Sequence, residues 1–252
     1  MTSPIKIIHL TDSHLFADKT AALRKIVTYD SLMSVISHIN GSDWNADCIL
    51  ATGDLTHDYS RQSYEHFCHL LGSLDTPVLC VPGNHDHRPI MQTVLAEFSF
   101  PYCQSREYDS WLIAGIDSCE EEKTGGKISN DEMLRLENLL KNYKSKNILI
   151  GLHHPPIDIG SQWLDSVGLS NQEKFFSLIR KFQNVKGIIF GHAHQKFNKI
   201  VNNINILGTP STCRQFKRKS DNFAVDDNPP AYRRVYLKPD GEIHSELIWI
   251  SR

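Results

Sequence analysis

The chain has 252 residues, of which 40% are hydrophobic and 22% are charged, and its formal net charge is −2. This composition is typical of a globular protein with a large core, and the near-neutral charge argues against a nucleic-acid or membrane-surface partner. Because the sequence has no signal-peptide pattern, no apolar run of about 18 residues and no C-x-x-C pair among its six cysteines, we expect reduced thiols, no membrane association and a cytoplasmic location.

Short apolar runs with the length and β-branched content of strands recur along the chain. In chain order they are residues 5–10, 47–52, 77–82, 111–116, 147–152, 186–191, 204–208, 233–237 and 246–250. Between some of them, apolar residues at i, i+3, i+4 and i+7 spacing predict amphipathic helices over 32–39 and 64–71.

Two further helix starts are predicted by the Ser-x-x-Glu pattern of a capping box, at Ser129 with Glu132 and at Ser170 with Glu173. In this motif the Ser oxygen accepts an otherwise free backbone N–H, and the Glu side chain returns a hydrogen bond to the Ser backbone. We therefore expect a helix to begin directly after each Ser.

The order of the elements predicts one α/β domain over residues 1–252. The pattern is βαβα over the first two-thirds and mainly β over 197–252, where Lys-Pro-Asp-Gly-Glu at 238–242 has the composition of a hairpin turn. Three segments without periodicity are expected to be long loops: 118–127, 158–168 and 214–230.

A carboxylate, amide or imidazole directly follows each of five predicted core strands. The motifs are Asp12-Ser13-His14, Gly53-Asp54, Gly83-Asn84-His85-Asp86, His153-His154 and His192-Ala193-His194. In α/β proteins this edge of a sheet binds ligands, because the loops there converge on one crevice. Since residues i and i+2 of an extended chain point to the same side, Asp12 with His14 can present two ligands together, as can His192 with His194.

Seven of these side chains offer oxygen or nitrogen ligands, and none is a thiolate. They are Asp12, His14, Asp54, Asn84, His153, His192 and His194. Seven ligands are too many for one transition-metal ion but suit two ions that share Asp54, and mixed nitrogen and oxygen ligation favours Mn, Fe, Zn or Co. Any one motif alone is equally explained by polar caps and turn residues, whereas five in order favour a metal site.

The five motifs, between Asp12 and His194, resemble the sequence blocks of the calcineurin-like metallophosphoesterases. The resemblance implies a four-layer αββα sandwich with a di-metal centre between its two sheets. It also implies that Asp54 bridges the two ions. The ligands of the first ion would be Asp12, His14 and His194, and those of the second Asn84, His153 and His192.

His153 is preferred to His154 as a ligand because the family pattern reads His-x-Pro, which leaves His154 as a supporting or turn residue. Two metal ions would lower the pKa of a shared water and supply the hydroxide that attacks phosphorus. His85 is the candidate proton donor to the leaving oxygen, the alternative being a hydrogen-bonded turn residue. Asp86 either orients His85 or caps the next helix, and we expect His87 to be exposed and not catalytic.

The segment after Asp54 reads Leu-Thr-His-Asp and lacks the arginine with which protein phosphatases of this superfamily grip a phosphomonoester dianion. This favours a singly charged diester. Block spacing, together with residues 50–55, 81–86, 162–165 and 209–217, resembles the class III cyclic-nucleotide phosphodiesterases, in particular the bacterial enzymes for 3′,5′-cyclic AMP. The resemblance implies hydrolysis to 5′-AMP. Ligation by His, Asp and Asn favours Fe, Mn or both as the two divalent or mixed-valence ions.

The same resemblance implies which side chains surround the substrate phosphate: His14, Asp54, Asn84, His85 and His194. For Trp163, a place in the pocket wall and a place in the core remain open, and the basic run 214–219 is either a substrate loop or a solvated face. Alternative functions are a broader phosphodiesterase, for other cyclic nucleotides, nucleotide pyrophosphates or phospholipid diesters, and a non-catalytic metal-binding scaffold.

Overall fold

The computed structural model describes residues 3–251, in which two large β-sheets pack face to face. The first sheet has the order β15-β14-β1-β4-β5, with strands β1 (Ile5–Leu10), β4 (Cys48–Thr52), β5 (Val78–Val81), β14 (Ala231–Leu237) and β15 (Ile243–Trp249). The second has the order β10-β11-β9-β8-β7-β6, with strands β6 (Ser105–Glu107), β7 (Trp111–Gly115), β8 (Asn147–Leu152), β9 (Val185–Phe190), β10 (Phe197–Val201) and β11 (Ile204–Gly208).

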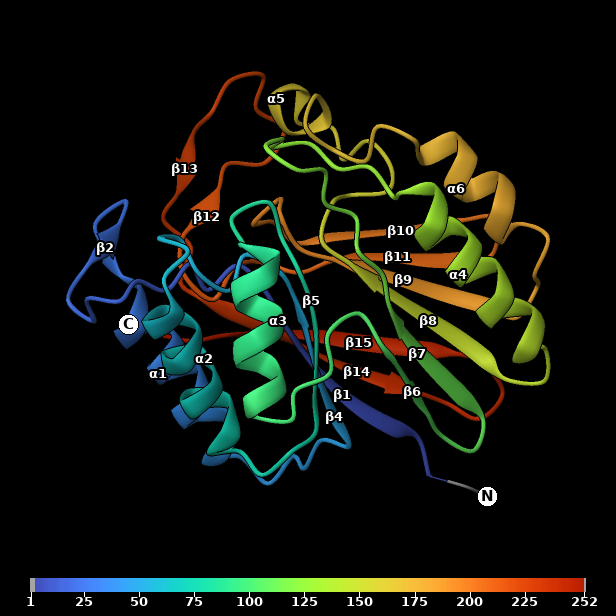
Figure 1. Cartoon of the computed structure of the whole chain (residues 1–252), viewed down its shortest axis with the longest axis horizontal. Coiled ribbons are helices and arrows are strands. Elements are labelled where there is room, and N and C mark those ends of the chain that lie inside the picture. Colours follow the sequence, from blue (N-terminus) through green and yellow to red (C-terminus); the bar gives the residue numbers. More distant parts are fainter. Residues whose placement is uncertain (1–2, 252) are drawn as a thin grey trace.

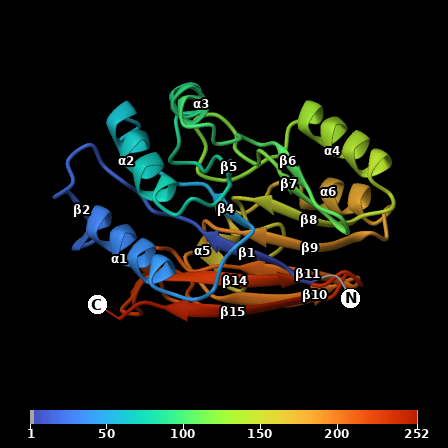
Figure 2. The ribbon, with the colours of Figure 1, turned by 90° about the horizontal axis from the view of Figure 1, so that it is seen from below.

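Helices cover the outer face of each sheet. The first group is α1 (Thr28–Asn40), α2 (Arg61–Gly72) and α3 (Arg88–Glu97), and the second is α4 (Asn130–Asn142) and α6 (Gln172–Ile179). Figure 1 shows the two groups on opposite sides of the strands. Figure 2 shows the C-terminal strands β14 and β15 at the margin opposite α3. The predicted four-layer αββα sandwich is confirmed.

The layers follow from the alternation of side chains along each strand. In β4, Ile49 packs against the helices of the first group, whereas its neighbour Leu50 packs against the other sheet. In β8, Leu149 likewise faces the first sheet, between Ile148 and Ile150, which face α4 and α6. Strands buried on both faces therefore read as continuous apolar runs in the sequence.

All nine predicted strands are present, with small shifts at their ends, such as a start of β15 at Ile243. The loops expected at 158–168 and 214–230 contain further short elements. These are α5 (Gln162–Asp165), β12 (Gln215–Phe216) and β13 (Val225–Asp226), and another small hairpin consists of β2 (Ala22–Leu23) and β3 (Ile26–Val27).

Only half of one predicted capping box forms. The Ser129 oxygen accepts the Glu132 N–H at 3.1 Å, but the Glu132 carboxylate instead accepts the backbone N–H of Asp117 at 2.9 Å. The prediction at Ser170 is wrong, because its hydroxyl donates to the Gly126 carbonyl at 2.8 Å and α6 begins later. In both cases a tertiary contact takes the side chain that the local motif would use.

The turn predicted at 238–242 is confirmed between β14 and β15. The N–H of Lys238 donates to the Glu242 carbonyl at 2.9 Å, and Gly241 adopts a positive φ of 94° that favours glycine. Within residues 3–251, no helix is both long and apolar enough to cross a membrane.

A substitution at Trp111 tests how much the inter-sheet core contributes to stability. Its ring is fully buried between the sheets, and its indole N–H donates to the Lys238 carbonyl at 2.8 Å. We expect Trp111→Ala to lower the free energy of unfolding by about 3–5 kcal/mol, because it leaves a cavity. Chemical denaturation measures this change. The control Trp249→Ala, at a ring that is 38% exposed, should cost less than about 1 kcal/mol, and equal losses would contradict the prediction.

Candidate metal centre

The loops after β1, β4, β5, β8 and β9 bring all seven predicted ligand side chains to one place. Their strands run parallel within each sheet, so the C-terminal ends of β1, β4 and β5 meet those of β8 and β9 at a common edge. Six of the seven side chains are buried and Asn84 is half-buried. They form two groups of converging ligand atoms.

The first group surrounds the Nε2 atom of His14. This atom lies 3.2 Å from His194 Nε2 and 3.6 Å from Asp54 Oδ2. His194 Nε2 in turn lies 3.3 Å from Asp12 Oδ1. Four potential ligand atoms thus converge from three loops.

The second group surrounds the Oδ1 atom of Asn84. This oxygen lies 3.0 Å from His192 Nδ1 and 3.2 Å from His153 Nε2. His153 Nε2 is also 3.4 Å from Asp54 Oδ1. Asp54 therefore directs one carboxylate oxygen toward each group.

Hydrogen bonds on the far side of two rings determine which nitrogen has a free lone pair. His153 donates from Nδ1 to the Thr52 carbonyl at 2.7 Å, and His194 donates from Nδ1 to the Arg214 carbonyl. The Nε2 atoms of both rings are therefore free of a proton in the neutral tautomer and face the two groups. Such back-bonding to a carbonyl is the usual orientation device for metal-binding histidines.

The donor set fits metal cations. Ligand atoms about 2.1 Å from one ion lie about 3.0–3.4 Å apart, which matches most of these separations. Asp12 and Asp54 are buried carboxylates, and their ion-pair partners within the described residues are imidazoles. Buried charge of this kind requires compensation, so the site is suited to positive charge.

The pKa values of the ligand rings shift in opposite directions. Burial opposes protonation of His153, but the Asp54 charge raises the pKa of His153 to about 9, so a metal ion would have to displace a proton from this ring. Burial holds the pKa of His14 and of His192 well below the usual value, so these rings are neutral. A neutral imidazole is the form that binds a metal ion.

The backbone at the ligands differs from the extended form assumed from the sequence. Asp12, His14, Asp54, His192 and His194 all have φ between 47° and 61°, in the left-handed region. Each such residue costs on the order of 1–3 kcal/mol. The side chains of Asp12 with His14, and of His192 with His194, do converge. The cause is a tight turn at each pair and not the alternation of side chains along an extended segment.

Backbone hydrogen bonds tie these turns together. The N–H of Asp12 donates to the Gly53 carbonyl at 3.0 Å, and the N–H of His14 donates to the Asp54 carbonyl at 2.9 Å. Gly83 packs so closely that a Cβ atom there would lie 2.2 Å from Asp54 Oδ1. The glycine before Asn84 is therefore required by the close approach of two loops.

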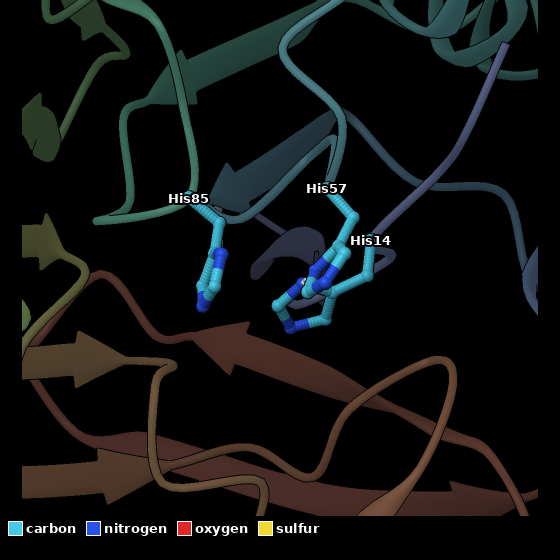
Figure 3. A group of neighbouring side chains, drawn as sticks. All are labelled: His14, His57 and His85. Carbon is cyan, nitrogen blue, oxygen red and sulfur yellow. Dashed lines mark hydrogen bonds between the residues drawn. The ribbon is translucent and has the colours of Figure 1, made fainter. Parts of the chain in front are cut away.

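His85 borders the cavity beside the first group, and its backbone N–H donates to Asp54 Oδ1 at 2.8 Å. Its ring stacks on His57 at a centroid distance of 4.7 Å, and His57 Nδ1 lies 3.3 Å from His14 Nδ1 (Figure 3). His57 is not among the candidate residues that the sequence motifs predicted. Its one available signal was its position in the loop after Asp54.

Asp86 does not cap the following helix. Its carboxylate accepts backbone N–H groups of Gly83, Leu55 and Thr56, and therefore joins the loops after β4 and β5. The exposed His87 is the N-cap of α3.

Both ring nitrogens of the buried His154 have protein partners, the Ser118 hydroxyl and the Thr124 carbonyl. Burial and the neighbouring His153 lower the pKa of His154 to about 3. His154 therefore holds a neighbouring segment beside the second group.

A cavity of about 270 Å³ adjoins the two groups. Trp163 and Arg214 border it, and Arg214 pairs with Asp227 at 2.9 Å. From the basic run 214–219, Phe216 also lines the cavity, whereas Lys217, Arg218 and Lys219 are not among its lining residues.

Comparisons with known proteins give one consistent family and fold. The model of the calcineurin-like phosphoesterase family matches residues 5–196. The protein named 3′,5′-cyclic adenosine monophosphate phosphodiesterase CpdA from Vibrio vulnificus is 37% identical over 244 residues, which cover 96% of this chain and 89% of that protein. Its counterpart from Escherichia coli K12 is 34% identical with the same coverage. A dimetal phosphatase from Danio rerio, 15% identical, has a similar fold with a TM-score of 0.68, over 99% of this chain and all of that chain.

Gly83→Ala tests the close packing of the loops. The added methyl group would meet Asp54, so we expect a loss of about 1–3 kcal/mol in the free energy of unfolding. The matched control is Gly72→Ala in α2, where a Cβ atom meets nothing within 4 Å and alanine favours the helix. Thermal and chemical denaturation compare the two variants, and equal stability would contradict the packing argument.

Proposed function

The chain belongs to the calcineurin-like phosphoesterase family, and from this membership we propose that it hydrolyses 3′,5′-cyclic AMP to 5′-AMP at two divalent metal ions. The observation that carries the proposal is the Asp54 carboxylate, which directs one oxygen to each of two groups of ligand atoms. The sequence identity to proteins named CpdA, over nearly the whole chain, supports cyclic AMP as the substrate.

In this proposal Asp54 would contact both ions. Asp12, His14 and His194 would hold the first ion, and Asn84, His153 and His192 would hold the second. Such ions, when bound, would supply charge neutralisation at the phosphoryl oxygens and a hydroxide at neutral pH. Imidazole with carboxylate and amide oxygen suits Fe and Mn, which are the metals we propose.

His85 is the proposed proton donor to the leaving 3′ oxygen. Its backbone bond to Asp54 and its stacking on His57 hold the ring at the cavity, next to the ligand groups. Five side chains then surround the substrate phosphate: His14, Asp54, Asn84, His85 and His194. A singly charged cyclic diester suits this site, because the loop after Asp54 carries no arginine to grip a phosphomonoester dianion.

We also propose a cytoplasmic location. Reduced cysteines are typical of that compartment, and no disulfide links the six cysteines within residues 3–251.

The broader alternative is a phosphodiesterase for other diesters. Metal quantification, followed by rates on cyclic AMP, cyclic GMP and a UDP-sugar, tests the choice. Metal-dependent release of 5′-AMP supports the proposal, and a strong preference for the UDP-sugar would overturn it.

Asp54→Asn tests the metal centre directly. Loss of the bridging charge should lower the metal content from about two ions per chain and reduce cyclic AMP hydrolysis by about 100-fold or more. Elemental analysis and steady-state rates measure both effects. The control is Asp58→Asn in the same loop, whose carboxylate accepts backbone N–H groups of Ala17 and Ser60, and which should retain both metals. Full metal content in Asp54→Asn would refute the bridging role.

His85→Ala tests proton donation. General acid catalysis contributes about 10²–10⁴-fold, so hydrolysis of cyclic AMP, with its basic alkoxide leaving group, should fall by that factor. Hydrolysis of bis(p-nitrophenyl) phosphate should fall much less, because its leaving group needs no proton. His87→Asn, which keeps a capping side chain at the neighbouring exposed position, is the control. Equal losses on both substrates would show that His85 does not act as the acid.

A further inference from the structure

Three aromatic side chains line the cavity beside the metal centre without belonging to it: Trp163, Phe216 and Phe223, here called the aromatic wall. Trp163 contacts Phe216 and Phe223 edge to face at centroid distances of 5.2 and 5.3 Å, and the two Phe rings lie 5.4 Å apart. Trp163 belongs to α5, Phe216 belongs to β12, and Phe223 lies between β12 and β13. Figure 1 shows α5 beside the segment that carries β12 and β13. Residues far apart in the chain therefore build one apolar surface.

The aromatic wall begins at the metal centre itself. The Phe216 ring stacks on His194 at a centroid distance of 4.1 Å and an interplanar angle of 10°. The backbone N–H of Phe216 also donates to the His194 carbonyl at 3.3 Å. A ligand whose phosphate lies at the centre consequently has its remaining part next to these rings.

The β2–β3 hairpin reaches the same cavity from the N-terminal part of the chain. Arg24, at its tip, places its guanidinium 4.9 Å from the centroid of the Phe223 ring, and Leu23 also lines the cavity. Arg24 and Lys25 both have positive φ, 49° and 71°, in a two-residue turn that usually contains Asn-Gly. The turn therefore presents a cation beside the aromatic wall despite unfavourable backbone angles.

We propose that the aromatic wall, with Arg24, binds the nucleobase of the substrate. The inference rests on the proposed function and adds the residues that distinguish a nucleotide from a simple diester. A purine is flat and apolar on its faces, and aromatic rings and guanidinium groups are the protein surfaces that bind such faces.

Phe223→Ala tests the proposal, because this side chain is 46% exposed and its removal leaves the core intact. Base–aromatic contacts are worth about 5- to 150-fold in binding, so KM for cyclic AMP should rise within that range with little change in kcat. The matched substrate is the abasic analogue, 1-deoxyribofuranose 3,5-cyclic phosphate. Its KM should be the same in the variant and the wild type.

Two further variants define the result. Phe223→Trp should restore a low KM for cyclic AMP, and Trp249→Ala, at an exposed ring outside the cavity, should leave both substrates unaffected. Inhibition by 5′-AMP should be weaker in Phe223→Ala than in the wild type. Inhibition by ribose 5-phosphate, which has no base, should be the same in both proteins.

The outcomes separate this inference from the proposed function. Two results would show that the aromatic wall does not bind the base. One is an equal kcat/KM of the wild-type protein for the abasic analogue and for cyclic AMP. The other is an equal rise in KM for both substrates in Phe223→Ala. If the metal-loaded wild-type protein hydrolyses bis(p-nitrophenyl) phosphate but neither cyclic substrate, the proposed function itself fails.

Discussion

The buried carboxylate of Asp54 is the interaction on which the arrangement of the centre depends. Its two oxygens face two separate groups of ligand atoms, and Oδ1 also accepts the backbone N–H of His85. Its own carbonyl accepts the His14 N–H. One residue at the end of β4 thus links loops from both sheets, and any shift of this loop moves both groups together.

This geometry is unfavourable for an isolated chain and depends on the surrounding core. Left-handed backbone angles at five ligands and two buried carboxylates oppose folding. The inter-sheet core around Trp111 and Leu149 opposes these costs by holding the strand ends in register. Strain and buried charge gathered at one edge of a well-packed sandwich are typical of a site in which function competes with stability.

The two ends of the cavity differ in chemistry. Near the centre the walls carry imidazoles and carboxylates, which suit metal ions and a phosphate. Farther away they carry Trp163, Phe223 and the Arg24 guanidinium, which suit a flat aromatic group. Phe216 joins the two ends by stacking on His194, so a substitution there would affect both the position of the His194 ring and the apolar wall.

Local patterns in the sequence predicted the strands and the seven candidate ligands, because strand periodicity and polar residues after strands can be read along the chain. The four layers were implied by the resemblance to a family and not by periodicity. The sequence did not determine the left-handed turns at Asp12 and His192, the loss of the cap at Ser170 or the stacking of His57 on His85. The tertiary structure decided these features, since each depends on atoms from another loop. The same holds for the contact of Arg24 with Phe223, which joins residues about 200 positions apart and which no local spacing encodes.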